Sequence, residues 1–191
     1  GGAKNRENVD ANPVISLYPE EAPDVTVNLD YAGTLTTTYP AYGEGWRVTA
    51  APDGTLTDLD TGQEYYCLFW EGVSETEYDF STGFCVAGED AAAFLEKALA
   101  GLGLTEKEAN EFIIYWLPKL EANPYNLISF QGETYTDSAA LTIDPVPDTL
   151  IRVFMAWKGL EEPVEVEPQT LTAPARSGFT AVEWGGAEVV S

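Results

Sequence analysis

Two glutamates that stand beside tryptophans are the residues in this sequence whose types and spacing best fit chemistry. Glu71 follows Trp70, and Glu183 precedes Trp184. An indole ring keeps water away from a neighbouring carboxylic acid, so the pKa of the acid rises and it can act as a general acid near neutral pH. Glycosidases use a pair of such acids. One interpretation is therefore a histidine-free hydrolase with Glu71 and Glu183 as catalytic residues.

The same residues also fit a structural or a binding role. Arg152 alternates with Phe154 and Ala156, which predicts an arginine on the buried face of a strand, where it can pair with the acids in a structural network. Alternatively, the indoles and carboxylates rim a cleft that binds a neutral or cationic partner, a glycan or a protein. The expected ligand-binding residues are Trp70, Glu71, Arg152, Glu183 and Trp184. We expect a non-catalytic binding or accessory module, with the hydrolase as the alternative.

Acidic residues also gather at two predicted turns, residues 52–54 and 61–63. They are Asp53, Asp58, Asp60 and Glu64. Carboxylate oxygens are ligands that calcium prefers, although this spacing differs from that of an EF-hand loop. Solvated hairpin turns explain the cluster equally simply, because Asp and Gly favour turns. We therefore expect no cofactor, with calcium as the alternative.

Several chemistries are excluded by what the sequence lacks. It contains no histidine, so it has neither a Ser-His-Asp triad nor a His-ligated metal. Gly101 and Gly103 begin like a dinucleotide fingerprint, but Glu106 occupies the third glycine position. Cys67 and Cys85 are the only cysteines, and they could be either bridged or reduced in the core.

Charge and composition limit the partners. The 191 residues include 9 Lys and Arg against 32 Asp and Glu, a formal net charge of −23 that repels nucleic acid. The chain is 45% hydrophobic and 12% aromatic, which predicts a folded core and not an acidic disordered tail. Its longest apolar runs are far shorter than the roughly 20 residues of a membrane span, so we expect no transmembrane segment.

The elements that must position these residues are mainly strands. Period-2 alternation or short apolar runs predict strands at 25–31, 35–39, 46–50, 65–70, 84–86, 126–130, 139–143, 151–157, 164–167 and 179–184. Helical spacing predicts one helix that ends at the glycines 101 and 103 and a second that begins with a capping box, Thr105 and Glu108, and ends or kinks at Pro118. We predict an α+β, β-rich fold: an antiparallel β-sandwich or two-sheet domain with a helical hairpin inserted at about residues 88–121.

The first eleven residues show no apolar periodicity and no initiator methionine. We expect residues 1–11 to be a disordered leader or an expression remnant, and residues 12–191 to form a single β-rich domain. Together with the acidity, this favours a secreted or cell-surface protein whose precursor carried a signal peptide or a lipid anchor. An acidic cytosolic protein is the alternative.

Five motifs spread over the chain carry a resemblance. They are PVISLYPE at 13–20, LFWE at 68–71, EFIIYWLP at 111–118, RVFM at 152–155 and VEWGG at 182–186. With them the sequence resembles a family of uncharacterised proteins, regarded as secreted and found mainly in Firmicutes, with relatives in some eukaryotes. Asn12 and Ser16 depart from the family pattern, which has Lys and an aromatic residue there. The resemblance implies a secreted or surface-associated protein and one continuous domain, and it implies no activity, substrate or cofactor.

Overall fold

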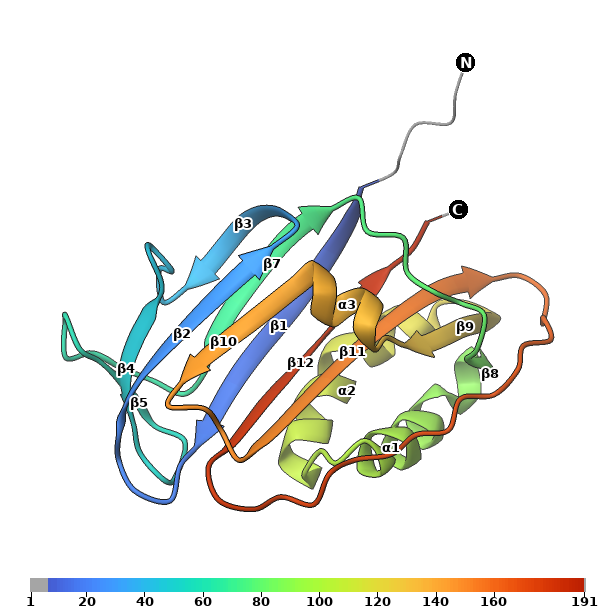
Figure 1. Ribbon diagram of the computed structural model, residues 1–191. Helices are drawn as coiled ribbons and strands as arrows, with labels where there is room; N and C mark the ends of the chain where they lie inside the picture. The colour runs from blue at the N-terminus through green and yellow to red at the C-terminus, as the bar shows by residue number, and fades with distance from the viewer. Residues whose placement is uncertain (1–6, 191) are drawn as a thin grey trace.

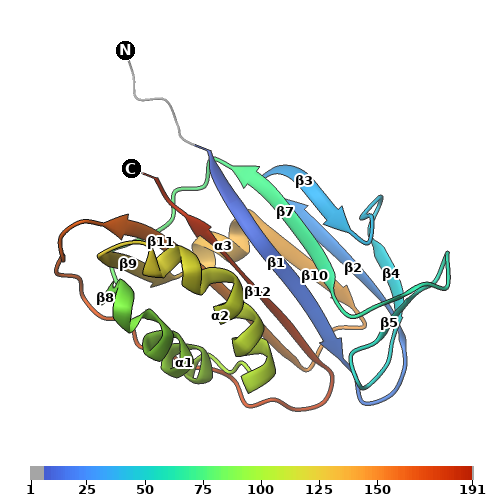
Figure 2. The ribbon, with the colours of Figure 1, turned by 180° about the vertical axis from the view of Figure 1, so that it is seen from behind.

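A computed structural model describes residues 7–190, which form three layers. A five-stranded sheet packs on one face of a seven-stranded sheet, and a pair of helices covers part of the other face (Figures 1 and 2). The predicted α+β fold with two sheets and a helical hairpin is therefore confirmed. One buried cluster of apolar side chains lies between the sheets and a second lies under the helices.

The seven-stranded sheet supplies most of the residues discussed below. In spatial order its strands are β3 (Gly33–Tyr39), β7 (Leu68–Ser74), β1 (Asn8–Tyr18), β12 (Thr180–Glu188), β11 (Thr149–Leu160), β9 (Tyr125–Phe130) and β8 (Phe84–Ala87). All neighbours are antiparallel except β11 and β12, which run parallel. A parallel pair needs a long crossover, and residues 161–179 make it without a helix.

The five-stranded sheet is antiparallel throughout. Its order is β10 (Ala139–Asp144), β2 (Asp24–Tyr31), β4 (Trp46–Ala50), β5 (Leu56–Asp58) and β6 (Glu64–Tyr65). In β2 the side chains of Val25, Val27 and Leu29 alternate with polar residues and face the larger sheet. This burial is what the period-2 pattern predicts for a sheet with one wet face.

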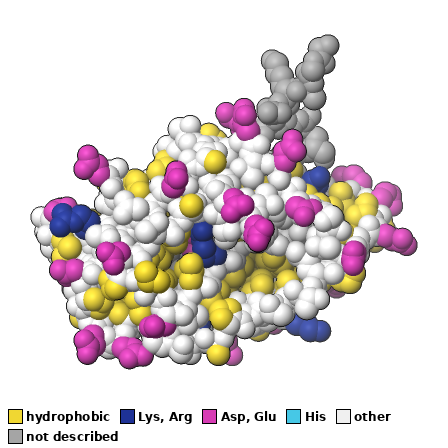
Figure 3. Space-filling view, viewed as in Figure 1, with side chains coloured by type: hydrophobic (Ala, Val, Ile, Leu, Met, Phe, Trp, Pro, Cys, Tyr) yellow, Lys and Arg dark blue, Asp and Glu magenta, His cyan; other side chains and the backbone are white. Residues whose placement is uncertain are grey.

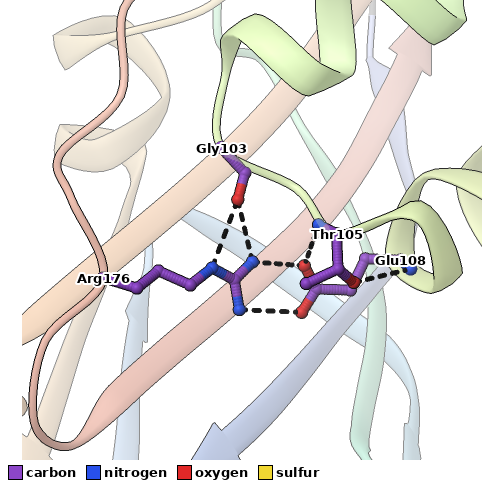
Figure 4. A network of polar contacts seen from close by, with 4 residues as sticks. All are labelled: Gly103, Thr105, Glu108 and Arg176. Atoms are coloured by element: carbon purple, nitrogen blue, oxygen red, sulfur yellow. Dashed lines mark hydrogen bonds and ion pairs between the residues drawn. The ribbon is translucent and has the colours of Figure 1, made fainter.

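The helical hairpin consists of α1 (Ala91–Gly101), preceded by the 3₁₀ turn η1 (Gly88–Asp90), and α2 (Glu106–Glu121). A short helix, α3 (Glu133–Ser138), lies on the opposite side of the larger sheet, next to β10 (Figure 1). The predicted capping box is confirmed: Thr105 Oγ1 accepts from the Glu108 N–H at 3.2 Å, and Glu108 Oε1 accepts from the Thr105 N–H at 2.8 Å. The Glu108 carboxylate also pairs with Arg176, whose guanidinium donates to the Gly103 carbonyl (Figure 4).

This cap gives a first testable prediction. Thr105→Ala removes the oxygen that satisfies an N–H of the first helical turn, so we expect the free energy of unfolding to fall by about 1 kcal/mol. Thr105→Ser keeps that oxygen and should lose well under half as much. Urea denaturation of the two variants measures the difference, and equal losses would show that the methyl group of Thr105 matters and the cap does not.

Three expectations need correction. The expected leader ends too late, because β1 begins at Asn8 and occupies the middle of the larger sheet; residues 1–6 lie outside the described residues. The predicted strand at 164–167 contributes only one isolated bridge, from Glu167 to Thr82, because the prolines at 163 and 168 lack N–H donors. Of the two outcomes expected at Pro118, an end of the helix is wrong, because α2 continues to Glu121. The carbonyl of Ile114 loses its helical partner there, but Ile114 is exposed and water can reach it.

Candidate functional site

Glu183 on β12 lies in a buried polar network between the two sheets. Its side chain is 1% exposed. Oε1 accepts from the Tyr135 hydroxyl at 2.6 Å and from Arg152 Nε at 3.0 Å, while Oε2 accepts from Trp70 Nε1 at 3.1 Å. Both carboxylate oxygens are therefore occupied by protein donors, and solvent has almost no access to them.

Sheet register explains why Arg152 reaches Glu183. The two residues lie opposite each other on the parallel strands β11 and β12. The Arg152 side chain is 7% exposed, and its guanidinium stacks over the Tyr135 ring at 4.8 Å. Its Nη2 lies 2.9 Å from Glu183 Oε1 but has no hydrogen bond of good geometry within residues 7–190. Burial is the largest single influence and lowers the pKa of Arg152, but the charge of Glu183, the Tyr135 hydroxyl and the hydrogen bonds to both together raise the pKa above its ordinary value, so the arginine stays charged.

A second buried acid, Asp10 on β1, was missed by the sequence analysis. Its carboxylate accepts from the hydroxyls of Tyr31, Tyr78 and Ser74. Burial raises the pKa of Asp10, the three hydroxyl donors oppose that rise, and the charge of Glu183 adds to it. The burial of Asp10 could not be predicted from the sequence, because polar residues fill inward positions of β1. A bulge also shifts the register of β1 between Asp10 and Val14, which interrupts the alternation.

Glu71 lies on the other face of the larger sheet, so the expected pairing of Glu71 with Glu183 is wrong. Trp70 faces the gap between the sheets and bonds to Glu183, and successive residues of a strand point to opposite faces. Glu71 instead accepts from the backbone N–H of Asn12 at 3.1 Å. The Glu71 carboxylate also lies close enough to Tyr115 on α2 to act on it: burial raises the pKa of Tyr115, and the charge of Glu71 raises it further. Glu71 is therefore on the face of the sheet that the helices cover.

Trp184 lies on that helical side as well, where its ring packs 5.4 Å from the ring of Phe112. The structure thus brings together three of the five expected ligand-binding residues, Trp70, Arg152 and Glu183, and separates Glu71 and Trp184 from them. All five indoles of the chain are buried. The expected indole-rimmed cleft is therefore wrong, because its rings are packed in the two cores.

The acidic turns show ordinary turn chemistry. Asp53 accepts from the Thr55 N–H, and Asp58 accepts from the N–H groups of Asp60 and Thr61. These bonds lower the pKa of Asp53 and Asp58. Asp60 makes an exposed ion pair with Arg47, and Glu64 lies on β6. Within the described part of the chain, no three Asp, Glu or Cys side chains converge as metal ligands would.

Both cysteines are free thiols. Burial, followed by the charge of Glu111, raises the pKa of Cys67 to about 11. At neutral pH the thiol therefore stays protonated and is a weak nucleophile. Cys85 accepts from the Val164 N–H at 3.5 Å and helps to hold the crossover segment against β8.

The most accessible aromatic group is a set of three tyrosines that the sequence analysis did not single out. Tyr39 ends β3, Tyr65 ends β6, and Tyr66 follows it. Tyr39 is 58% exposed and Tyr66 is 70% exposed, and the rings of Tyr39 and Tyr65 meet edge to face at 5.4 Å. These tyrosines line a hollow of about 380 Å³, which we call the tyrosine hollow, together with Thr55, Glu64 and Cys67.

Carboxylates flank the tyrosine hollow. Glu64 lies in its wall, and a second hollow of about 210 Å³ adjoins it and shares Thr55 and Tyr66 with it. Asp53 and Glu111 line that second hollow, and Lys107 lines it as well and offsets part of their charge. Large exposed aromatic rings beside carboxylates can bind a neutral or cationic group by ring contact, hydroxyl hydrogen bonds and charge.

Comparison with protein-family models, with curated proteins and with solved structures found no match to this chain. None of the described helices is long and apolar enough to cross a membrane. The described residues form a closed network of polar side chains in the core and an open, tyrosine-lined hollow at the surface.

Proposed function

We propose that this protein is a non-catalytic binding module that binds a basic segment of a protein partner in the tyrosine hollow. One observation carries the proposal: two strongly exposed tyrosines, Tyr39 and Tyr66, stand with Tyr65 around a single hollow. A folded chain usually buries such rings in its core, and exposed rings gathered at one place are typical of an interaction surface.

The negative charge of this protein favours a partner with basic side chains. The net charge of −23 attracts cations, and acidic side chains clearly outnumber basic ones on the face shown in Figure 3. At the hollow itself, Glu64 and the neighbouring Asp53 and Glu111 supply local carboxylates. A Lys or Arg side chain could lie against a tyrosine ring and pair with one of these acids, which is worth about 0.5–1 kcal/mol for each exposed cation–π contact.

The positions of the candidate catalytic residues also support binding over catalysis. Glu183 is enclosed by Arg152, Tyr135 and Trp70, and Glu71 lies across the sheet from it. Two acids separated in this way cannot attack the same glycosidic bond. Histidine is absent from the sequence, and the raised pKa of Cys67 makes it a poor nucleophile. The hydrolase alternative is not retained.

The proposal includes the secreted or cell-surface location expected from the sequence, which the acidic composition supports. A glycan would also bury its apolar faces against tyrosine rings. The absence of buried amide or arginine groups in the wall of the hollow favours the peptide, because sugar recognition needs several fixed polar partners for the hydroxyl groups. Glycan binding is therefore an outcome that the experiment must distinguish.

The experiment is a selection from a random peptide library displayed on phage, with the immobilised protein as bait and a glycan array in parallel. We expect peptides rich in Lys or Arg, and we expect Tyr66→Ala to weaken the best of them at least about tenfold. Ile114→Ala is the matched control, because Ile114 is an equally exposed large side chain, 76%, on the outer side of α2. Equal affinities for the two variants, or binding to glycans alone, would refute the proposal.

A further inference from the structure

Strand β3 forms an open edge of the larger sheet. It pairs with β7 on one side, and among the residues that the structure describes no strand pairs with its other side. Figures 1 and 2 both show it at the outer rim of the molecule. Gly33, Thr34, Thr36 and Thr37 are exposed. The edge therefore presents backbone N–H and C=O groups that another extended chain could pair with.

The composition of β3 is unusual for an exposed edge. Its sequence, GTLTTTY, contains no charged residue and no proline, in a chain in which one residue in six is acidic. Natural edge strands are usually protected by charges or prolines. The other edges are charged, short or covered: β10 ends at the charged Asp144, β6 has only two residues, and the crossover segment bridges to Thr82 next to β8. Like β10, β3 is followed directly by a proline, Pro40, so the difference between these two edges is the charge.

The edge of β3 leads directly into the tyrosine hollow. Tyr39 is the last residue of β3 and also lines the hollow, where its ring contacts Tyr65. A bulge between Leu35 and Thr37 divides the edge, so the part next to the hollow is residues 37–39. An extended segment that pairs with this part of β3 would place its next side chains over the tyrosine rings.

We infer that the partner binds by strand addition: an extended, basic peptide segment pairs with the outer edge of β3 and places a Lys or Arg side chain in the tyrosine hollow. Backbone hydrogen bonds would supply affinity and the hollow would supply specificity, as in other strand-addition complexes. A second copy of this chain is disfavoured as the strand that pairs with β3, because each copy carries a net charge of −23 and the two molecules would repel each other. This inference rests on the proposed function and specifies its binding mode.

The test uses the full chain and the tightest peptide from the library selection. Amide hydrogen exchange, measured with and without this peptide, should show new protection in residues 37–39. Thr36→Lys should weaken binding about tenfold, because a lysine on the edge repels a basic peptide and blocks its approach. Thr36 has no partner residue on β7 and is exposed, so the fold should tolerate the change.

The matched control is Thr142→Lys, which makes the same charge change at an exposed position of the edge strand β10. It should alter binding less than about twofold. Equal losses for the two lysine variants, or no protection in β3, would overturn strand addition. If Tyr66→Ala still abolished binding in that case, the tyrosine hollow would stand as the binding site and only the binding mode would fail. If no peptide binds, both the mode and the proposed function fail.

Discussion

Glu183→Gln is expected to lower the free energy of unfolding by about 3–5 kcal/mol, since it leaves the buried Arg152 guanidinium without its counter-charge. The loss should depend little on salt, because buried ion pairs are poorly screened. Urea denaturation at neutral pH measures it. The substitution keeps the size and shape of the side chain, so the loss would report charge and hydrogen bonding and not a cavity.

Glu71→Gln is the matched control for that experiment. Glu71 lies on the opposite face of the sheet and accepts one hydrogen bond, from the Asn12 N–H, which a glutamine can also accept. We expect a loss below about 1 kcal/mol. Equal losses in the two variants would contradict the placement of the two glutamates.

Asp10→Ala should also have a large effect and lower the free energy of unfolding by about 2–3 kcal/mol. The substitution removes the acceptor of three hydroxyl groups: those of Tyr78 and Ser74, which are buried, and that of Tyr31, which is half-buried. Thermal unfolding measures the loss. An unchanged melting temperature would show that these hydroxyls find other partners, contrary to the network described for Asp10.

The pH dependence of stability separates the charge of Asp10 from its hydrogen bonds. Burial raises the pKa of Asp10 above its value in the unfolded chain, so the folded state binds the proton more tightly. Protonation of Asp10 therefore adds to the free energy of unfolding at low pH, and this contribution is lost as the pH rises through the raised pKa of Asp10. Lowering the pH from 7 towards about 4 should stabilise the wild-type protein more than Asp10→Asn. A constant difference between the two would contradict the raised pKa.

Much of the fold was predictable because local patterns and tertiary packing agree. The alternation in residues 25–31 gave β2, and Thr105 with Glu108 gave the start of α2. Strand β1 escaped prediction because Asn8 and Asp10 occupy buried positions that apolar residues usually fill. Asp10 depends on hydroxyl partners from β2, from the end of β7 and from the segment after it, and Asn8 donates to the Thr76 carbonyl; no local pattern contains that information.

The candidate site was only partly predictable, for a geometric reason. The alternation of Arg152 with Phe154 and Ala156 correctly indicated a buried arginine. Alternation also implies that Trp70 and Glu71 point to opposite faces, but it does not say which of them shares a face with Glu183. That depends on strand order, here β7, β1 and then β12. The tyrosine hollow likewise joins the ends of β3 and β6, strands of two different sheets.

A double-mutant cycle tests most directly the claim that Glu183 belongs to a closed structural network and not to an acid pair. Unfolding free energies would be measured for Glu183→Gln, Arg152→Met and the double variant, and in parallel for Glu183→Gln combined with Glu71→Gln. We predict a coupling of about 2–3 kcal/mol between Glu183 and Arg152 and less than about 0.5 kcal/mol between Glu183 and Glu71. Strong coupling between the two glutamates, with none to Arg152, would contradict the account.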